Sequence, residues 1–138
     1  MSNSSSLASG HIHAAPTAAP HPDLEANLSI LREHGLDLNG FHLDPITLDI
    51  GAQSLQLKEP MFDLKQVRLA DGSGAHFVFF PCKITYAGKP MFGFIWLDLD
   101  HPQPLGKVRV LGPRLKVVEV GGDITLEFDP RRASLVQG

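Results

Sequence analysis

From residue 46 onward the chain alternates short β-prone runs with turn residues, and this pattern restricts the fold more than any other feature. The turns fall at residues 51–52, 71–74, 87–90, 112–113 and 121–122, where glycine recurs. Such spacing is typical of antiparallel strands joined by hairpins. No stretch between the turns resembles a crossover helix, so a parallel sheet is not expected. We predict a mainly-β fold, in which an antiparallel meander of about eight strands forms a small barrel or a sandwich.

The two ends of the chain differ from this central part. Residues 1–20 are rich in Ser, Ala and Pro and contain little that could be buried, so a disordered arm is expected that is dispensable for folding. They also lack the charged start and apolar run of a signal peptide, which favours a cytoplasmic location. We expect a single domain over residues 21–130, which is large enough to bury a core. Residues 131–138 are expected to be a flexible tail.

One amphipathic helix is predicted over residues 22–34. Pro22 suits a first helical position, and Gly35 suits the position after the last turn. A leucine stripe repeats at helical spacing on one face, formed by Leu24, Leu28 and Leu31. This stripe predicts that the helix packs on the sheet.

Period-two arithmetic predicts the cross-strand pairs, because a strand alternates its side chains between two faces. In residues 46–57, a turn at Gly51-Ala52 pairs Leu48 with Leu55. In residues 107–128, turns at 112–113 and 121–122 predict three strands in sequence. Their shared apolar face comprises Val108, Val110, Leu115, Val117, Leu126 and Phe128.

The same three-stranded arrangement bears on nucleic-acid binding. Lys107, Arg109, Arg114 and Lys116 form a basic cluster in the sequence. The predicted pairing puts Lys116 opposite Glu127 and Arg114 opposite Asp129, which makes a charge ladder that neutralises itself. With a net charge of −3 for the whole chain, nucleic acid is not an expected partner.

The most β-prone segment is residues 75–100. We predict a hairpin whose four-residue loop, 87–90, is closed by Tyr86 and Met91, because a two-residue Gly88-Lys89 loop would need an N–H that Pro90 lacks. One face is aliphatic and predicts core. The other face carries five of the chain's ten aromatic residues: Phe77, Phe79, Phe92, Phe94 and Trp96. Pro81, in mid-hairpin, predicts a bulge or an edge.

This aromatic face is the candidate binding site. Three interpretations are open: plain core covered by the helix, an interface with a partner protein or a second copy, or a pocket for a small apolar ligand. Lys83 and Arg68 are candidates to hold the polar end of such a ligand, and Asp98 is a third candidate.

Catalytic and metal signatures are weak. His76 and His101 are predicted to face each other at the mouth of the hairpin, but the sequence supplies no third ligand, and we expect no metal and no cofactor. Asp98 and Asp100 share one strand face and could serve as an acid–base pair. Cys82 points toward the core in the predicted register, where a thiol is inert.

The sequence therefore favours a non-catalytic binding or interaction module, a small cytoplasmic accessory protein that could form a homodimer. A second hypothesis is a small-ligand barrel, with or without enzymatic activity, whose pocket is lined by the aromatic face. A nucleic-acid-binding barrel is third. No apolar run approaches the roughly 18 residues that suggest a membrane span.

Overall fold

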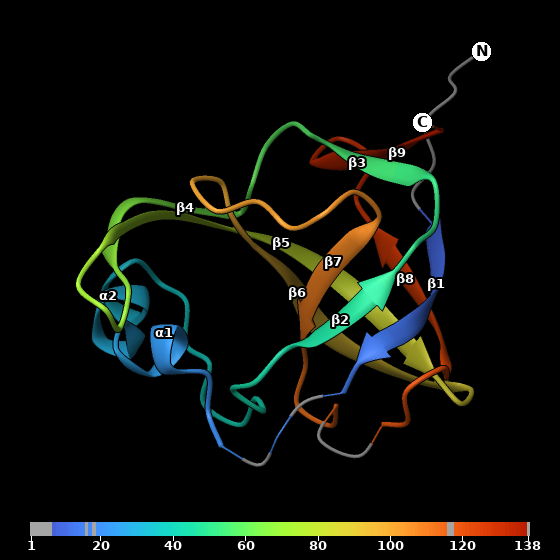
Figure 1. Ribbon diagram of the computed structural model, residues 1–138, viewed down its shortest axis with the longest axis horizontal. Helices are drawn as coiled ribbons and strands as arrows, with labels where there is room; N and C mark the ends of the chain where they lie inside the picture. Colours follow the sequence, from blue (N-terminus) through green and yellow to red (C-terminus); the bar gives the residue numbers. More distant parts are fainter. Residues whose placement is uncertain (1–6, 16, 18, 116–117, 138) are drawn as a thin grey trace.

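The computed structural model describes residues 7–15, 17, 19–115 and 118–137, and its centre is a closed antiparallel β-barrel (Figure 1). The predicted mainly-β class is confirmed, and of the two architectures left open the chain adopts the barrel. The described strands are β1 (Leu7–Ala14), β2 (Ile46–Asp49), β3 (Gln53–Leu57), β4 (Phe62–Arg68), β5 (Gly74–Tyr86), β6 (Lys89–Asp98), β7 (Lys107–Leu111), β8 (Asp123–Phe128) and β9 (Ala133–Gln137).

Six strands close the barrel. Around it they follow the order β5, β6, β7, β2, β1 and β8, and β8 pairs with β5 again. β4 extends the sheet beyond the barrel, because it pairs with the first half of β5 while β8 pairs with the second half. β3 and β9 form a separate two-stranded sheet.

The N-terminal segment differs from the expected disordered arm. Residues 7–14 form β1, which lies between β2 and β8 and is antiparallel to both. Ala8 and Ile12 are buried in the barrel core. The composition misled the prediction because β1 is held mainly by backbone pairing with two neighbouring strands, and Ile12 is its one large buried side chain. Residues 1–6 lie outside the described residues.

The C-terminal segment also differs from the expected flexible tail. Ala133–Gln137 forms β9, which pairs with β3 along its full length. The buried Ala133 packs against the barrel core. The backbone N–H groups of Lys58 and Glu59, just after β3, both donate to the Arg132 carbonyl.

The hairpins predicted in residues 46–57 and 107–128 are absent from the described part of the chain. β2 pairs with β1 and β7 instead of with β3, so the predicted pair of Leu48 and Leu55 does not form. β7 pairs with β2 and β6, and residues 113–115 form a turn where a strand was predicted. The predicted faces survive these changes: Val108, Val110, Leu115, Leu126 and Phe128 are all buried. Val117 lies outside the described residues.

The central hairpin forms with a register two residues from the predicted one. Tyr86 pairs with Lys89, so the loop is the two-residue turn Ala87-Gly88, and both of its residues have positive φ. Pro90 is tolerated because it faces Thr85, one step from the closing pair, at a non-hydrogen-bonded position. A shift of two residues leaves every side chain on its predicted face.

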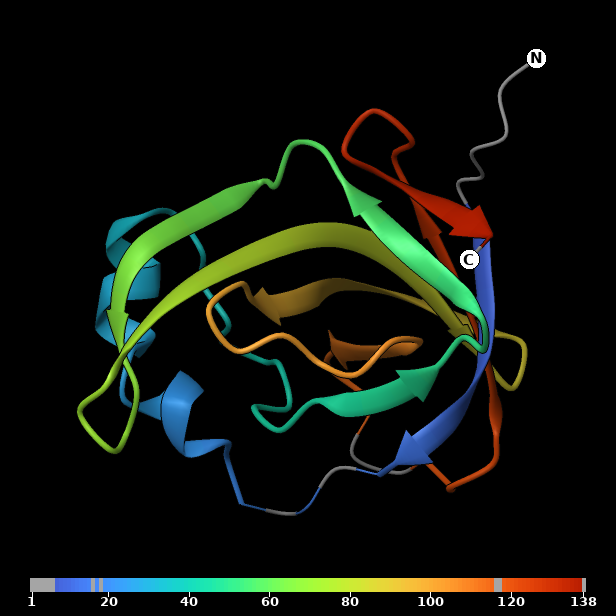
Figure 2. The ribbon, with the colours of Figure 1, turned by 45° about the horizontal axis from the view of Figure 1, so that its top comes forward.

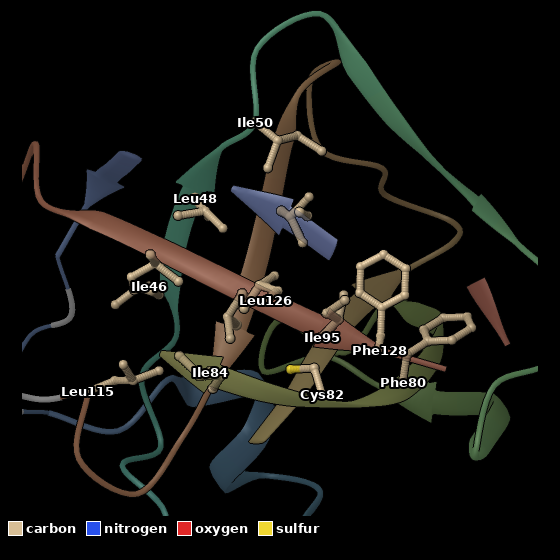
Figure 3. Packing of buried hydrophobic residues seen from close by; sticks show 14 of the residues in the cluster. Ile46, Leu48, Ile50, Phe80, Cys82, Ile84, Ile95, Leu115, Leu126 and Phe128 are labelled. Atoms are coloured by element: carbon tan, nitrogen blue, oxygen red, sulfur yellow. The ribbon is translucent and has the colours of Figure 1, made fainter. Parts of the chain in front are cut away.

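This hairpin is buried on both faces. Its inner face belongs to the barrel core, where Phe80, Cys82, Ile84 and Ile95 meet residues of the other barrel strands (Figure 3). Its outer face holds Phe77, Phe79, Phe94 and Trp96, which pack in a second cluster with leucines of the helical segment. The long, curved β5 and β6 therefore separate two cores, as Figure 2 shows with the helices at one end of the sheet.

The predicted helix is two short helices, α1 (Pro22–Glu25) and α2 (Leu28–Glu33). They are joined through Asn27, whose buried side-chain amide donates to the carbonyls of Asp23 and Arg68, both at 2.7 Å. The helix break therefore ties the helical segment to the end of β4. Leu24 and Leu31 are fully buried, as the leucine stripe predicted.

Deleting residues 1–15 removes β1, and we expect the truncated protein to lose its cooperative thermal transition. The reason is that β2 and β8 would become unpaired edges and the core would lose Ile12. Circular dichroism on heating measures this. Deletion of residues 1–6 is the control, with an expected midpoint close to that of the full chain. A truncated protein as stable as the full chain would show that β1 is not part of the barrel.

Gly93 lies on β6 where a Cβ atom would collide with the Leu111 carbonyl oxygen and with Ile84. Gly93→Ala should lower the free energy of unfolding by at least about 2 kcal/mol, because a packed strand leaves no room to relax. Gly74→Ala is the matched control, since no atom lies within 4 Å of the added methyl group. Urea denaturation compares the two, and equal stabilities would contradict the close approach of β6 to the end of β7.

Candidate functional site

Four of the five rings of the predicted aromatic site lie in the core. Phe77, Phe79 and Trp96 are fully buried, and Phe94 is nearly so. The rings contact one another, with Phe77 edge-on to Trp96 at a centroid distance of 5.1 Å. Leu24 and Leu31 cover them. Of the three interpretations of this face, plain core describes these four residues.

The other three predicted site residues are exposed, and Arg68 lies apart from the other two. Phe92 is 56% exposed on β6, beside Lys83 on β5. Arg68 pairs with Gly74 at the opposite end of β5. That position lies nine residues from Lys83 along β5, about 30 Å at roughly 3.4 Å per residue. Lys83 and Arg68 therefore do not line one pocket.

The described surface instead has an apolar groove at one end of the barrel, which we call the end groove. Its cavity volume is about 210 Å³. Its apolar walls come from β3, from the ends of β2 and β6, from the 99–106 loop and from the start of β7: Ile50, Leu55, Leu57, Leu97, Leu99, Pro102, Pro104, Leu105 and Val108. Leu57, Leu99 and Leu105 are all exposed, and Leu105 is the most exposed of the three at 72%.

Local backbone contacts shape the groove. The chain leaves the barrel after β2 through Gly51, which has positive φ, and this turn directs β3 away from the barrel. The Ile50 N–H donates to the Gly106 carbonyl at 2.8 Å, which ties this exit to the 99–106 loop. Gly106 is required there, because a Cβ would collide with the Gly51 carbonyl oxygen. The Lys107 ammonium forms an ion pair with the carboxylate of Asp49 on the adjacent strand, β2, with an N–O distance of 3.1 Å.

Carboxylate and histidine side chains near this end make separate pairs. Asp98 is buried and accepts hydrogen bonds from the backbone N–H groups of His76 and Asp100, and it contacts His101 Nδ1 at 2.8 Å. His76 instead contacts Asp63 at 2.5 Å. The predicted pairing of His76 with His101 does not form. Among the described residues, no three His, Cys, Asp or Glu side chains are grouped to hold a metal ion.

Asp98 is a structural acceptor in this geometry. Its carboxylate fixes the end of the β5–β6 hairpin by accepting from the His76 N–H on β5 and from the Asp100 N–H just after β6, and Asp100 is exposed. The two carboxylates therefore do not face one another as an acid–base pair. Cys82 lies in the barrel core, where burial raises the pKa of its thiol to about 12.

The predicted charge ladder on the C-terminal strands does not form among the described residues. Arg114 donates to the Pro90 carbonyl at 2.9 Å, and Asp129 pairs with Arg131 at 3.1 Å. Glu127 lies opposite Lys83 on β5. Lys116 lies outside the described residues. Arg109 lies between Thr47 and Trp96, where the side chain stacks on the indole ring.

Sequence reasoning missed the end groove because it assigned Leu55 and Leu57 to a hairpin with β2. Once these residues are paired with β2, they count as core. One signal was present: Leu105 is a large apolar residue in a proline-rich loop, where burial is uncommon.

Comparisons with known proteins leave the geometry as the only guide to function. No model of a known protein family matches the sequence, and no curated protein is similar to it at a significant level. In the part of the chain that is described, no helix has the length and hydropathy to cross a membrane.

The burial of Trp96 predicts that Trp96→Ala acts as a core truncation. It should lower the free energy of unfolding by about 3–5 kcal/mol. Phe92→Ala, on the exposed end of the same strand face, should change it by no more than about 0.5 kcal/mol. Chemical denaturation followed by circular dichroism measures both variants. A mild effect of Trp96→Ala would mean that the aromatic face is accessible and not core.

Proposed function

We propose that this protein is a non-catalytic binding module and that the end groove binds an extended apolar segment of a partner protein. The observation that carries the proposal is the row of exposed leucines, Leu57, Leu99 and Leu105, around an apolar cavity. Exposed apolar surface that is concave and contiguous is typical of an interaction site, whereas isolated exposed leucines are ordinary.

The size of the groove favours a peptide segment over a small-molecule ligand. Small-molecule pockets usually enclose about 300–1,000 Å³, and the end groove measures about 210 Å³. A cavity of this volume accommodates one or two side chains of a partner. The barrel interior is filled by core side chains, so it supports no larger ligand cavity (Figure 3).

The backbone of β3 supports an extended conformation for the partner. Among the described strands β3 pairs with β9 alone, so its second edge keeps unpaired N–H and C=O groups. Alternate side chains of β3, Leu55 and Leu57, line the groove. A segment that adds to such an edge gains main-chain hydrogen bonds, and its alternate side chains enter the pocket.

The other hypotheses receive less support. Asp98 is already bonded to three donors, which leaves it poorly placed for acid–base chemistry. Arg109 and Arg114 do not form a common basic surface, which weighs against nucleic acid. The single buried cysteine needs no oxidising compartment, and this agrees with the proposed cytoplasmic location.

Selection of random peptides displayed on phage tests the proposal. We expect enriched peptides with alternating apolar residues, and synthetic copies should bind the protein in fluorescence polarisation. Leu105→Asp and Leu99→Asp should each raise the Kd at least tenfold, because a carboxylate would have to be desolvated in the groove. Val120→Asp, at an exposed valine outside the groove lining, is the matched control and should leave the Kd unchanged.

Two results would overturn the proposal. One is that no peptide is enriched over background. The other is that the enriched peptides bind all three variants like the unsubstituted protein. If apolar dyes bind and Leu105→Asp abolishes dye binding while no peptide binds, the small-ligand hypothesis replaces this one.

A further inference from the structure

Arg109 occupies an unusual place on the outer face of the barrel. It lies on β7 between β2 and β6, and its guanidinium carbon is 3.9 Å from the centroid of the Trp96 ring. The face of an indole ring attracts a cation, and a stacked guanidinium keeps its planar fork in a fixed orientation. Arg109 is therefore a rigid cation.

No described residue accepts a hydrogen bond from Arg109. Its Nε is buried without a partner, and so is the indole nitrogen of Trp96 beside it. Arg109 as a whole is partly exposed. No carboxylate of the described chain lies within 4.0 Å of this guanidinium. The fork is thus open to an acceptor from outside.

The nearest carboxylates are engaged elsewhere. Burial lowers the pKa of Arg109, and the charges of Asp98 and Asp23 oppose that shift, so the side chain stays cationic. Asp23 accepts from the Ala70 N–H at 2.8 Å, and Asp98 holds its own three donors. They stabilise the charge of Arg109 without occupying its fork.

His21 completes the surroundings. Its ring lies edge-on to Trp96 at a centroid distance of 5.1 Å, and its Nδ1 accepts from the Asp23 N–H. Burial lowers the pKa of His21 from its ordinary value. The negative charge of Asp23 opposes this shift, the positive charge of Arg109 adds to it, and the negative charge of Asp44 opposes it. Because Nδ1 accepts a hydrogen bond, the ring is neutral and its proton is assigned to Nε2. His21 therefore adds no charge beside Arg109.

We infer that Arg109 anchors a second binding site, distinct from the end groove, that takes an oxyanion of a small molecule, either a phosphate or a carboxylate. The fork of an arginine matches two oxygens of such a group, and a charge-assisted pair is the strongest hydrogen bond available to it. This site differs from the end groove because Arg109 is not among the residues that line the groove, whereas Val108, the preceding residue on β7, is.

Trp96 is the only tryptophan and contacts Arg109, so its fluorescence reports on this site. Titration with inorganic phosphate and, separately, with acetate should give a saturable change in Trp96 fluorescence. The anion that binds more tightly shows whether the natural ligand carries a phosphate or a carboxylate. Sodium chloride at matched ionic strength is the control and should give no saturable change. Calorimetry on the same samples measures the affinity independently of fluorescence.

Variants of the full chain assign the effect to Arg109. Arg109→Gln should abolish the saturable change, and Arg109→Lys should weaken binding at least tenfold, because a lysine keeps the charge and loses the fork. Asp23→Asn should tighten binding severalfold. It removes a repelling charge, and its amide oxygen can still accept from Ala70.

The inference is overturned if neither anion gives a saturable change, or if Arg109→Gln responds like the unsubstituted protein. Should the Arg109 variants fail to fold, Asp23→Asn decides: unchanged or weaker binding would contradict the site. Leu105→Asp in the end groove should leave anion binding unaltered, so failure of this inference is distinguishable from failure of the proposed function.

Discussion

The two-sided burial of the β5–β6 hairpin is the constraint on which the rest of the structure depends. A sheet with one buried face needs one partner layer, but this hairpin has apolar side chains on both faces. The inner face is satisfied by closing the barrel, and the outer face is satisfied by α1, α2 and β4. Each remaining element therefore covers one side of β5 and β6 or extends the barrel.

Pro81 lies where one edge of β5 passes from pairing with β4 to pairing with β8. The Phe79 carbonyl accepts from the Met61 N–H just before β4, so the backbone groups of residues 79 and 81 point to the same edge. The pairing of β4 ends at Phe79 and the pairing of β8 begins at Cys82. The missing N–H of Pro81 falls in the gap between them, where no ladder hydrogen bond is lost.

The same packing leaves only the surface for a binding site. The barrel interior and the aromatic face are both filled, so a binding site can form only where side chains reach the surface. The end groove arises where β3 departs from the barrel, and Arg109 stands out because its stacking partner Trp96 offers no acceptor. Adjacent residues of β7, Val108 and Arg109, point to these two different surfaces.

The sequence by itself determined the β class, the turn positions and the face of nearly every side chain in the central hairpin. These features depend only on nearby residues. A register shift of two keeps each side chain on the same face of the strand, and a glycine favours a turn whichever strand pairs with its neighbours. The leucine stripe likewise predicted which helix residues are buried, because it depends only on spacing within one element.

Beyond the β5–β6 hairpin, the tertiary structure alone decided which strands pair. β2 could close on β3 with a sound hairpin, yet its two edges are taken by β1 and β7, because closing the barrel pairs more backbone than one short hairpin does. No local pattern in residues 7–14 reveals that they complete a barrel, since their contribution is mainly backbone pairing with distant strands. The end groove and the isolation of Arg109 follow from those long-range pairings, and for that reason neither could be predicted from the sequence.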